Sequence, residues 1–372
     1  MRIAVIGLGV LGASTARALT RHGAQVTVFE RTAPGAGTTA TSYGWVNSHR
    51  KHLRSYHDLN VAGMAEHVAL WEDGCDWYIR SGLLEWASGD DGRERLATTV
   101  AQLREYGYPL EPITRAQAAE LAPDLLIPSN VADLVWYPSE GYAPPIPLLA
   151  RLWGEARDLG AELRCPAEVV AVEPVADGAV VHAAGVDPER FDRVVLTVGR
   201  WTGALAPTIP MTAAEDPASP GLLAYTAPLP VRVPFPIITP ELNLRPDGGG
   251  RLVLHALDLN AMAVDETYFH EVLQRLGHVL RGGEHAHIDK VSLGLRSLPA
   301  DGHTVAGSDT SGHVYILATH SGVTLGPLLG RLAAQEILRD ELAPELADFR
   351  PQRFQDTIAF PPLAPARHAG EQ

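Results

Sequence analysis

The sequence predicts an α/β fold in which a doubly wound, Rossmann-like domain is discontinuous along the chain and the segments inserted into it form a second sheet domain. An apolar strand at residues 3–6 runs directly into a glycine-rich turn and a helix. Strands and helices of the same kind return in the middle of the chain and near its end. Between them lie short β-like runs broken by proline and glycine, which are typical of antiparallel sheets.

The N-terminal turn has the spacing of a dinucleotide-binding loop. Gly7, Gly9 and Gly12 form a GxGxxG pattern. The first glycine allows a tight turn, the second lets the backbone approach a pyrophosphate, and the third lets the helix pack close to the sheet. The helix expected at residues 11–21 would direct free N–H groups and its positive dipole end at the phosphates.

The segment after this helix completes the motif. A C-cap at Gly23 precedes a strand expected at residues 25–29, whose end delivers Glu30 to the position of a ribose hydroxyl. Glu30 lies eighteen residues after Gly12, close to the spacing of about twenty that this motif requires. Strand, turn, helix, second strand and acid in this order predict dinucleotide binding, and they do not distinguish NAD from FAD.

Composition and charge limit the classes of partner. The chain has 372 residues, of which 46% are hydrophobic and 20% charged, so it is long enough for two cores. Its 30 basic and 44 acidic residues give a net charge of −14, and no basic run is present to bind nucleic acid or an anionic membrane. We expect no signal peptide, because the sequence enters the first strand at once, and no apolar stretch approaches the roughly eighteen residues that span a bilayer. Two distant cysteines, Cys75 and Cys165, predict reduced thiols, a cytoplasmic location and no metal site.

The remaining elements follow from hydrophobic periodicity and turn signals. Helices are expected at residues 56–81, 96–106, 115–121, 148–159, 266–280 and 325–338, the third of them capped by Thr114. Strands are expected at residues 168–172, 193–198, 251–256, 291–297 and 313–318, with a hairpin around residues 177–178.

Small and hydroxylated residues fill the segment at residues 35–47, directly after Glu30. Thr38, Thr39 and Ser42 can donate hydroxyls to phosphate oxygens, and Gly44 lets the backbone pass near a cofactor ring. The segment therefore predicts a second cofactor contact; the alternative is an ordinary polar loop.

A second helix N-terminus follows the strand expected at residues 313–318. His320, Ser321, Gly322, Val323 and Thr324 lie between that strand and the helix that starts at Leu325. Backbone N–H groups at such a position stabilise negative charge on a reduced ring. The alternative is a plain connection between strand and helix.

Arg296 is the strongest signal for a substrate, in the sequence Gly294-Leu295-Arg296. A guanidinium pairs bidentately with a carboxylate, and the nearby glycine permits close approach. The alternative is a surface ion pair.

Taken in order, these segments resemble the FAD-dependent D-amino acid oxidase family, in the branch that includes glycine oxidase, sarcosine oxidase and D-amino acid dehydrogenases. The resemblance extends over nearly the whole chain. It is carried by GLGVLG at residues 7–12, Glu30, GTTATSYG at 37–44, SEGYAPP at 139–145, VVLTVGRWTGAL at 194–205, RPDGGGRLVL at 245–254, GLRSLPADGHTVAG at 294–307 and ATHSGVTLGPLLGRLAAQEI at 318–337.

The resemblance implies a discontinuous Rossmann-like FAD-binding domain of the glutathione reductase type, joined to an inserted substrate domain with a mixed, mainly antiparallel sheet. The FAD-binding domain is expected at residues 1–85, 138–210 and 295–360. The substrate domain is expected at residues 86–137 and 211–294, and a loose tail at residues 361–372.

The resemblance also implies the cofactor, which is FAD, and the residues that hold it. Binding is expected to be noncovalent. Neither cysteine lies in the C-terminal segment where sarcosine oxidases attach FAD, and residues 42–47 lack the linkage histidine of some related dehydrogenases. The expected cofactor-binding residues are Gly7, Gly9, Val10, Leu11, Gly12, Glu30, Arg31, Thr38, Thr39, Ser42, Gly44, Trp45, Val169, Val170, Gly199, Trp201, Arg296, Ser321, Gly322, Val323, Thr324 and Leu325.

The implied reaction is oxidation of the C–N bond of a small amino acid or N-alkyl amino acid, such as a D-amino acid, glycine, sarcosine or a cyclic imino acid. Hydride passes to flavin N5 and an imine forms, with reoxidation by O2 to H2O2 or by an electron carrier. Arg296 is expected to hold the substrate carboxylate, and Trp45, Asn243 and His320 complete the expected catalytic set. Asn243 replaces a tyrosine that often helps to hold the substrate, and Ser297 replaces the proline common after the arginine.

Three other functions remain open at this level: an NAD-dependent dehydrogenase, a flavoprotein hydroxylase, and a noncatalytic dinucleotide-binding protein. A polar group near Trp45, made of His49, Lys51, Tyr56 and Asn60, is expected to be a solvated loop. His255 and His320 are each compatible with a structural or a catalytic role.

Overall fold

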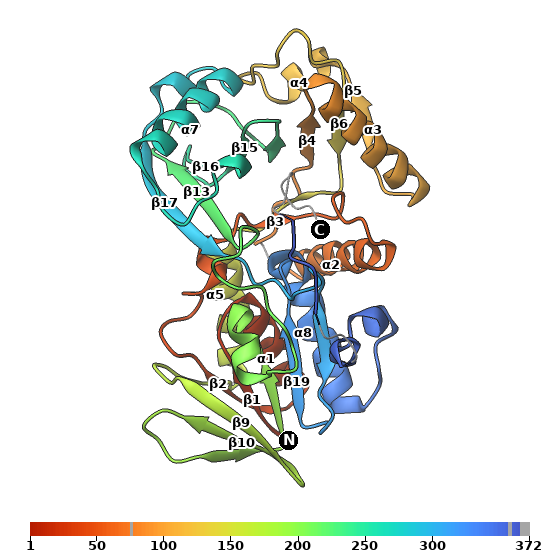
Figure 1. The fold of residues 1–372 in the computed structure, drawn as a ribbon, viewed down its shortest axis with the longest axis vertical. Helices are drawn as coiled ribbons and strands as arrows, with labels where there is room; N and C mark the ends of the chain where they lie inside the picture. The colour runs from red at the N-terminus through yellow and green to blue at the C-terminus, as the bar shows by residue number, and fades with distance from the viewer. Residues whose placement is uncertain (75–76, 356–358, 365–372) are drawn as a thin grey trace.

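A six-stranded sheet occupies the half of the molecule that carries the N-terminus (Figure 1). The computed structural model describes residues 1–74, 77–355 and 359–364. The strand order is β18-β19-β12-β1-β2-β8, and all pairs are parallel except β18 with β19. The strands are β1 (Arg2–Ile6), β2 (Gln25–Phe29), β8 (Glu162–Arg164), β12 (Arg193–Leu196), β18 (Val305–Ser308) and β19 (Val314–Ala318).

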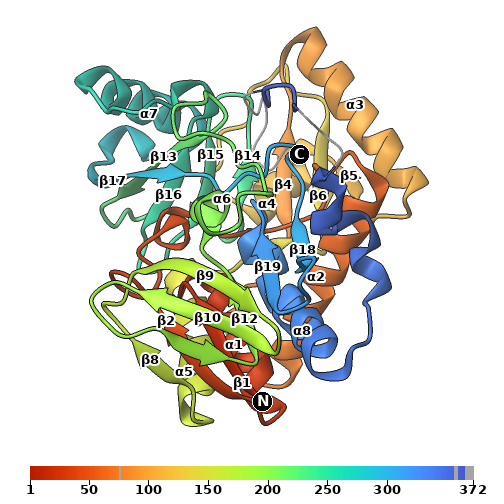
Figure 2. The ribbon, with the colours of Figure 1, turned by 60° about the horizontal axis from the view of Figure 1, so that its bottom comes forward.

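Both faces of this sheet are covered. Along β1, Ile3 and Val5 belong to the core beneath the helices, whereas Ala4 and Ile6 belong to the core beneath a three-stranded meander. This explains why the strand is apolar at consecutive positions instead of alternating. Figure 2 shows the meander in front of the sheet. The helices are α1 (Val10–Arg21), α5 (Pro145–Asp158), α8 (Gly322–Arg339) and, packed on α8, α2 (Arg54–Glu72); the meander is β9 (Val169–Val175), β10 (Gly178–Ala183) and β11 (Glu189–Phe191).

An eight-stranded sheet forms the other half, in the order β17-β13-β16-β15-β14-β4-β6-β5. Only the β14–β4 pair is parallel, so the sheet is mixed and mainly antiparallel, as predicted. Its strands are β4 (Leu83–Trp86), β5 (Glu111–Ile113), β6 (Leu134–Tyr137), β13 (Pro220–Thr226), β14 (Ile237–Ile238), β15 (Asn243–Pro246), β16 (Leu252–His255) and β17 (Ile288–Leu295).

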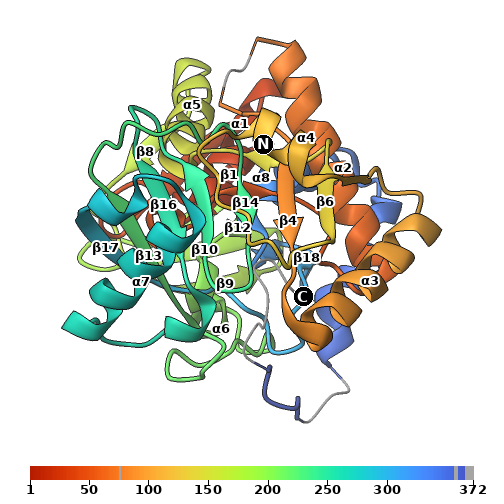
Figure 3. The ribbon, with the colours of Figure 1, turned by 90° about the horizontal axis from the view of Figure 1, so that it is seen from above.

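Helices cover this second sheet as well (Figure 3). Apolar residues of α4 (Arg115–Leu121) and α7 (Glu266–Val279) share a core with β4, β13 and β16, whereas α3 (Gly89–Glu105) packs on the opposite side with Leu83 and Tyr137. Thr114 caps α4 through a capping box with Gln117, as the sequence predicts for this residue.

Short elements connect the two halves. A two-stranded ribbon, β3 (Trp45–Val46) with β7 (Gly141–Tyr142), lies between the sheets. The other short helices are α6 (Thr202–Leu205), η1 (Thr38–Thr41), η2 (Gly199–Trp201), η3 (Leu257–Leu259), η4 (Gly283–His285), η5 (Pro344–Phe349) and η6 (Pro351–Phe354). No helix in the described ranges is long and apolar enough to span a membrane.

The prediction of one helix over residues 56–81 is wrong at its C-terminal end. The helix α2 ends at Glu72, and Gly74 follows with φ of +89°, a left-handed conformation that terminates helices. A second glycine, Gly82, turns the chain at φ +75° into β4, where Trp86 is a strand residue. Gly74 therefore ends the helix and Gly82 turns the chain into the next strand, although the apolar periodicity of residues 56–81 favours one continuous helix.

Smaller differences concern helix starts and the chain end. The helix expected at residues 148–159 begins at Pro145, because proline is well suited to the first helical turn. The helix expected from Leu325 begins at Gly322. Of the expected tail, Leu363 and Ala364 line a cavity, and residues 365–372 lie outside the described residues, as does Cys75; Cys165 is exposed.

Candidate active site

Two adjoining cavities lie where the two halves meet. The first, of about 400 Å³, is bounded by the carboxyl ends of β1, β2 and β12; we call it the strand-end cavity. The second, of about 500 Å³, lies against β13, β16 and β17; we call it the sheet-side cavity. They share Thr38, Ser42, His320 and Val323, so the two spaces are continuous. A crevice at the carboxyl ends of parallel strands is the usual place for a ligand in this architecture.

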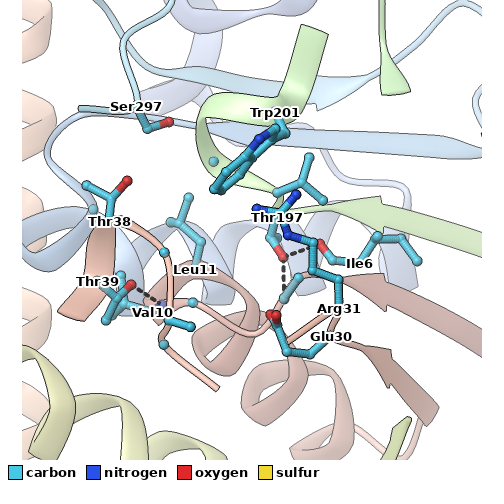
Figure 4. Close-up of a pocket in the computed structure, with 18 of the residues that line it drawn as sticks. Ile6, Val10, Leu11, Glu30, Arg31, Thr38, Thr39, Thr197, Trp201 and Ser297 are labelled. Atoms are coloured by element: carbon cyan, nitrogen blue, oxygen red, sulfur yellow. Dashed lines mark hydrogen bonds between the residues drawn. The ribbon is translucent and has the colours of Figure 1, made fainter. Parts of the chain in front are cut away.

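The glycine turn forms the floor of the strand-end cavity. Gly7 has φ of +95°, and a Cβ there would lie 2.8 Å from the carbonyl oxygen of Thr197. A Cβ on Gly12 would lie only 2.0 Å from the carbonyl oxygen of Gly7. The turn is fixed from both sides, because Thr197 Oγ1 donates to Gly7 O at 2.9 Å and Val10 N–H donates to Thr39 Oγ1 at 3.1 Å (Figure 4).

The walls of this cavity carry the predicted polar residues. Thr38 and Thr39 lie on one side in Figure 4, and Glu30 and Arg31 on the other. The carboxylate of Glu30 accepts hydrogen bonds from Leu8 N–H and Thr32 N–H, both at 2.9 Å, which fixes its orientation at the end of β2. The Arg31 guanidinium stacks over the Trp201 ring at 3.9 Å.

Both helices that begin at the cavities lack a cap from the side chain of their N-cap residue. The N-cap residues are Gly9 for α1 and Ser321 for α8. Each helix start therefore presents positive dipole ends and main-chain donors toward the space it borders. The arrangement fits a dinucleotide with its pyrophosphate at α1 and a ring that gains negative charge at α8.

The side chain of Arg296 lies in the sheet-side cavity beyond the end of β17. Its Nη1 donates to the carbonyl oxygens of Ala218 at 2.9 Å and Pro220 at 2.8 Å. Within the described part of the chain, Nε and Nη2 make no hydrogen bond, and Gly221 leaves room for the guanidinium over β13. Burial lowers the pKa of Arg296 to about 10, so it stays charged at neutral pH. This is a cation with one bidentate edge available to a carboxylate.

His255 borders Arg296 and stays neutral. Burial, followed by the charge of Arg296, lowers the pKa of His255 to about 3. Asn243 pairs with His255 across β15 and β16, so the two side chains share a face of the sheet. Asn243 is buried and does not line either cavity; the predicted role for it stays a prediction.

Comparison with known proteins decides the family. The family model described as DAO, FAD dependent oxidoreductase, matches residues 2–336. The chain belongs to this family. Glycine oxidase of Geobacillus kaustophilus is 24% identical over 361 residues, covering 93% of this chain and 95% of the relative. N-methyl-L-tryptophan oxidase of Yersinia pestis is 24% identical over 355 residues, covering 86% of this chain and 92% of the relative.

The fold comparison agrees. The crystal structure of the G. kaustophilus glycine oxidase has a TM-score of 0.83 to this DAO family member, at 23% sequence identity, covering 95% of this chain and 99% of the other. The predicted fold class, FAD as the cofactor, and FAD-dependent oxidoreductase as the class of enzyme are confirmed.

The cavities bring together most of the residues predicted to bind the cofactor. The sheet-side cavity receives Gly44, Trp45, Arg296, Ser321 and Thr324, and Val323 and His320 lie where the two cavities meet. Gly12 and Leu325 line neither, since Gly12 packs behind Gly7 and Leu325 is in the core. The strand-end cavity receives Gly7, Gly9, Val10, Leu11, Glu30, Arg31, Thr38, Thr39, Ser42, Val169, Val170, Gly199, Trp201 and Gly322.

The expectation of a solvated loop around His49 is wrong. His49, Lys51, Tyr56 and Asn60 are all buried, none more than 3% exposed. Their partners come from distant parts of the chain, which local sequence does not reveal. Tyr56 donates to Ser321 Oγ at 3.0 Å, and Asn60 Nδ2 donates to the carbonyl oxygen of Tyr56 at 2.8 Å.

A buried carboxylate, Glu140, organises this region. It is 0% exposed and accepts from Trp45 Nε1 at 3.1 Å, Tyr108 OH at 2.7 Å, and the main-chain N–H groups of Ser48 and His49 at 3.2 and 3.1 Å. His49 Nδ1 adds a contact at 3.0 Å. Burial alone would raise the pKa of Glu140, but His49 and these donors outweigh it and hold the pKa below 4.5. Glu140 therefore fixes Trp45, a wall of the sheet-side cavity.

A second buried carboxylate extends the network toward the eight-stranded sheet. Glu85 pairs with Arg50, accepts from Tyr137 OH at 3.0 Å and lies 3.4 Å from His49 Nε2. Neither Glu85 nor Glu140 stood out in the sequence, although Glu140 lies in the SEGYAPP segment of the DAO resemblance. A buried acid is not distinguishable from a surface acid until its donors are placed around it.

A Gly12→Ala variant should lose most of its bound FAD. The new methyl would overlap the Gly7 carbonyl, so the turn must shift, at a cost of about 1–3 kcal/mol. Visible flavin absorbance per protein after gel filtration measures the loss. Gly154→Ala in α5 is the matched control, because a Cβ there meets nothing within 4 Å. Equal flavin content in both variants would contradict the prediction.

Proposed function

We propose that this DAO family member oxidises the C–N bond of a small amino acid or N-alkyl amino acid. D-amino acids, glycine, sarcosine and cyclic imino acids are the compounds considered. The observation that carries the proposal is Arg296, a partly buried cation with a bidentate edge toward the sheet-side cavity. The names of the relatives, glycine oxidase and N-methyl-L-tryptophan oxidase, describe enzymes of amino acids and support the same substrate class.

The chain's own residues would orient the substrate and shape the charge around it. Arg296 would hold the carboxylate and thereby place the neighbouring amine and carbon in the cavity. Trp45 and His320 would wall the same space, and the start of α8 would stabilise negative charge. When bound, FAD supplies the hydride acceptor that converts the amine to an imine, which water then hydrolyses.

No side-chain base is required in this scheme if the neutral form of the amine binds. His255 is held neutral beside Arg296, so it adds no second positive charge next to the carboxylate anchor. Reoxidation by O2, giving H2O2, or by an electron carrier completes the proposed cycle. We place the enzyme in the cytoplasm, on the basis of its low cysteine content.

Replacing Arg296 with alanine tests the anchor. Removing a cation that pairs with a ligand carboxylate inside a cavity costs about 2–5 kcal/mol, which is a rise in Kd of roughly 30- to 4,000-fold. Anaerobic bleaching of the flavin by a panel of amines, amino acids and N-alkyl amino acids measures this directly.

The control is Arg251→Ala, which removes a half-exposed arginine paired with Asp289 in the same sheet. It should bleach as the wild type does. If carboxylate substrates reduce Arg296→Ala as readily as the wild type, the assigned anchor is wrong. If no compound of the panel reduces the wild-type flavin, the proposed function itself fails.

A further inference from the structure

His255 presents one ring nitrogen to the sheet-side cavity. The residue lines this cavity and is 7% exposed. Its Nε2 lies 3.5 Å from Nδ2 of Asn260. Within the described part of the chain Nδ1 makes no hydrogen bond, and it is not fully enclosed by the protein. Nδ1 is therefore the ring nitrogen that can meet a ligand.

The orientation of the Asn260 amide decides which ring nitrogen carries the proton. Asn260 follows η3, and its Oδ1 accepts the main-chain N–H of Leu222 on β13 at 2.8 Å. A main-chain N–H only donates, so the amide oxygen faces it and the NH2 group faces His255. Nε2 is then the acceptor, and in a neutral imidazole the proton lies on the other nitrogen. Nδ1 thus carries an N–H toward the cavity.

The ring is neutral in this setting. Burial, followed by the charge of Arg296, lowers the pKa of His255 to about 3. Two further neighbours are also neutral. The Tyr43 ring lies 6.1 Å from the imidazole, and burial raises the pKa of its hydroxyl, whereas Asn243 is the partner of His255 on β15. Arg296 is therefore the cation that shares this part of the cavity with the ring.

The sheet places His255 within reach of a ligand on Arg296. The Arg296 guanidinium lies over Gly221 on β13. Ala224 of β13 pairs with Leu254 of β16, so the next residue, His255, is a diagonal neighbour of Gly221 on the same face of the sheet. Diagonal neighbours are about 7–8 Å apart. Two hydrogen bonds of about 2.9 Å with one carboxylate between them span such a gap.

We propose that His255 is a second binding residue for the substrate carboxylate. Its Nδ1–H donates to a carboxylate oxygen while Arg296 binds the carboxylate through its free edge, and Asn260 positions the ring by fixing the tautomer. A neutral donor adds a hydrogen bond to the anion without the cost of burying a second cation. This inference rests on the proposed function, because it takes Arg296 as the anchor for an amino acid carboxylate.

The tautomer can be observed without any ligand. Long-range proton–nitrogen correlation spectra of the FAD-loaded enzyme, labelled with nitrogen-15 in its histidines, distinguish the two neutral tautomers at pH 7. We expect the proton of His255 on Nδ1, with the signals assigned by their loss in His255→Phe. A proton on Nε2, or a protonated ring, overturns the inference.

Binding of a non-oxidisable acid tests the contact itself. Propanoate is titrated into the FAD-loaded enzyme, and the perturbation of the flavin spectrum gives the Kd. His255→Phe should raise this Kd roughly 10- to 150-fold, as for the loss of a hydrogen bond to a charged group. His270→Phe, at an exposed position on α7, is the matched control and should keep the wild-type Kd. A wild-type Kd in His255→Phe overturns the inference.

Asn260→Asp tests the positioning role at nearly constant shape. The aspartate keeps an acceptor for the Leu222 N–H, but it offers an oxygen to Nε2 in place of an N–H. At pH 8 the proton of His255 should move to Nε2 and leave the lone pair of Nδ1 toward the ligand. We expect the Kd for propanoate to rise at least as much as in His255→Phe, together with the other tautomer in the spectra. A moved proton with an unchanged Kd overturns the inference.

Anaerobic flavin reduction by amino acids separates this inference from the proposed function. In His255→Phe the Kd for the substrate should rise while the limiting rate of reduction changes less, because the ring binds the carboxylate and takes no part in hydride transfer. Reduction of His255→Phe with wild-type affinity overturns the second donor and leaves amino acid oxidation standing. Propanoate binding that depends on His255, with no reduction of the wild type by any amino acid, overturns the proposed function alone.

Discussion

Glu140→Ala should lower the free energy of unfolding by about 3–5 kcal/mol. The carboxylate is fully buried and is the shared acceptor for Trp45, Tyr108 and the backbone of Ser48 and His49. Removing it leaves these donors buried and without their acceptor, and each such donor costs about 1–3 kcal/mol. The effect should therefore exceed that of an ordinary truncation.

Denaturant titration of the FAD-loaded enzyme measures this loss. Glu271→Ala is the control, since Glu271 makes a partly exposed pair with Arg275 on α7 and such pairs contribute at most about 1 kcal/mol. Glu140→Gln separates charge from shape, because the amide keeps one acceptor for Tyr108 or Trp45. A loss below about 1 kcal/mol for Glu140→Ala would show that the donors find other acceptors.

The same variant should disturb the active site. Trp45 walls the sheet-side cavity, and residues 47–51 carry Lys51 into it. With Glu140 gone, the indole N–H loses its acceptor and Trp45 its fixed position. We expect a changed flavin spectrum and a raised KM for the substrate in Glu140→Ala. Glu271→Ala should show no measurable change in either quantity.

Mild acid should destabilise the enzyme already at pH values well above those at which carboxylates titrate. Burial lowers the pKa of His67 to about 4 and, together with Arg296, lowers that of His255 to about 3, whereas an unfolded histidine has a pKa of about 6.5. Between these values the unfolded chain binds more protons than the folded one, so stability falls as the pH falls. Each group should cost about 2 kcal/mol on going from pH 7 to pH 5.

Unfolding free energies at several pH values test this dependence. Burial also lowers the pKa of His49, His57 and His303, which act in the same direction. His67→Gln should reduce the slope of stability against pH, because an amide does not titrate in this range. The amide can still donate to Val323 O, which His67 Nε2 contacts at 2.8 Å. A stability that is flat from pH 7 to pH 5 would mean that these rings are protonated in the folded protein.

The local part of the site could be predicted from sequence. Gly7, Gly12 and Glu30 belong to one strand-turn-helix-strand unit, and its spacing alone places them at the end of β1 and β2. The residues from His320 to Thr324 were found for the same reason, since a strand followed by a helix start is a local signal. Arg296 needed the family resemblance, because an arginine alone does not show whether it faces a cavity.

The buried polar network could not be predicted in this way. Glu140 meets His49 across 91 positions of sequence, and Tyr56 meets Ser321 across 265. Before these partners are placed, a run of histidine, arginine and lysine is indistinguishable from a solvated loop. The helix end at Glu72 is a different case, because Gly74 and Gly82 are local stop signals, whereas the apolar periodicity of residues 56–81 favours a longer helix.

The order of strands in the six-stranded sheet has a consequence for biosynthesis. β1, made first, pairs with β12 from the middle of the chain, and β12 pairs with β19, which ends at Ala318. The glycine turn is thus among the first parts to leave the ribosome, but the opposite wall at residues 319–324 is among the last. The cavity proposed for FAD cannot close until nearly the whole chain has been made, so we expect flavin loading to follow the synthesis of α8. Truncation before α8 would leave a nascent chain with the GxGxxG motif and no site.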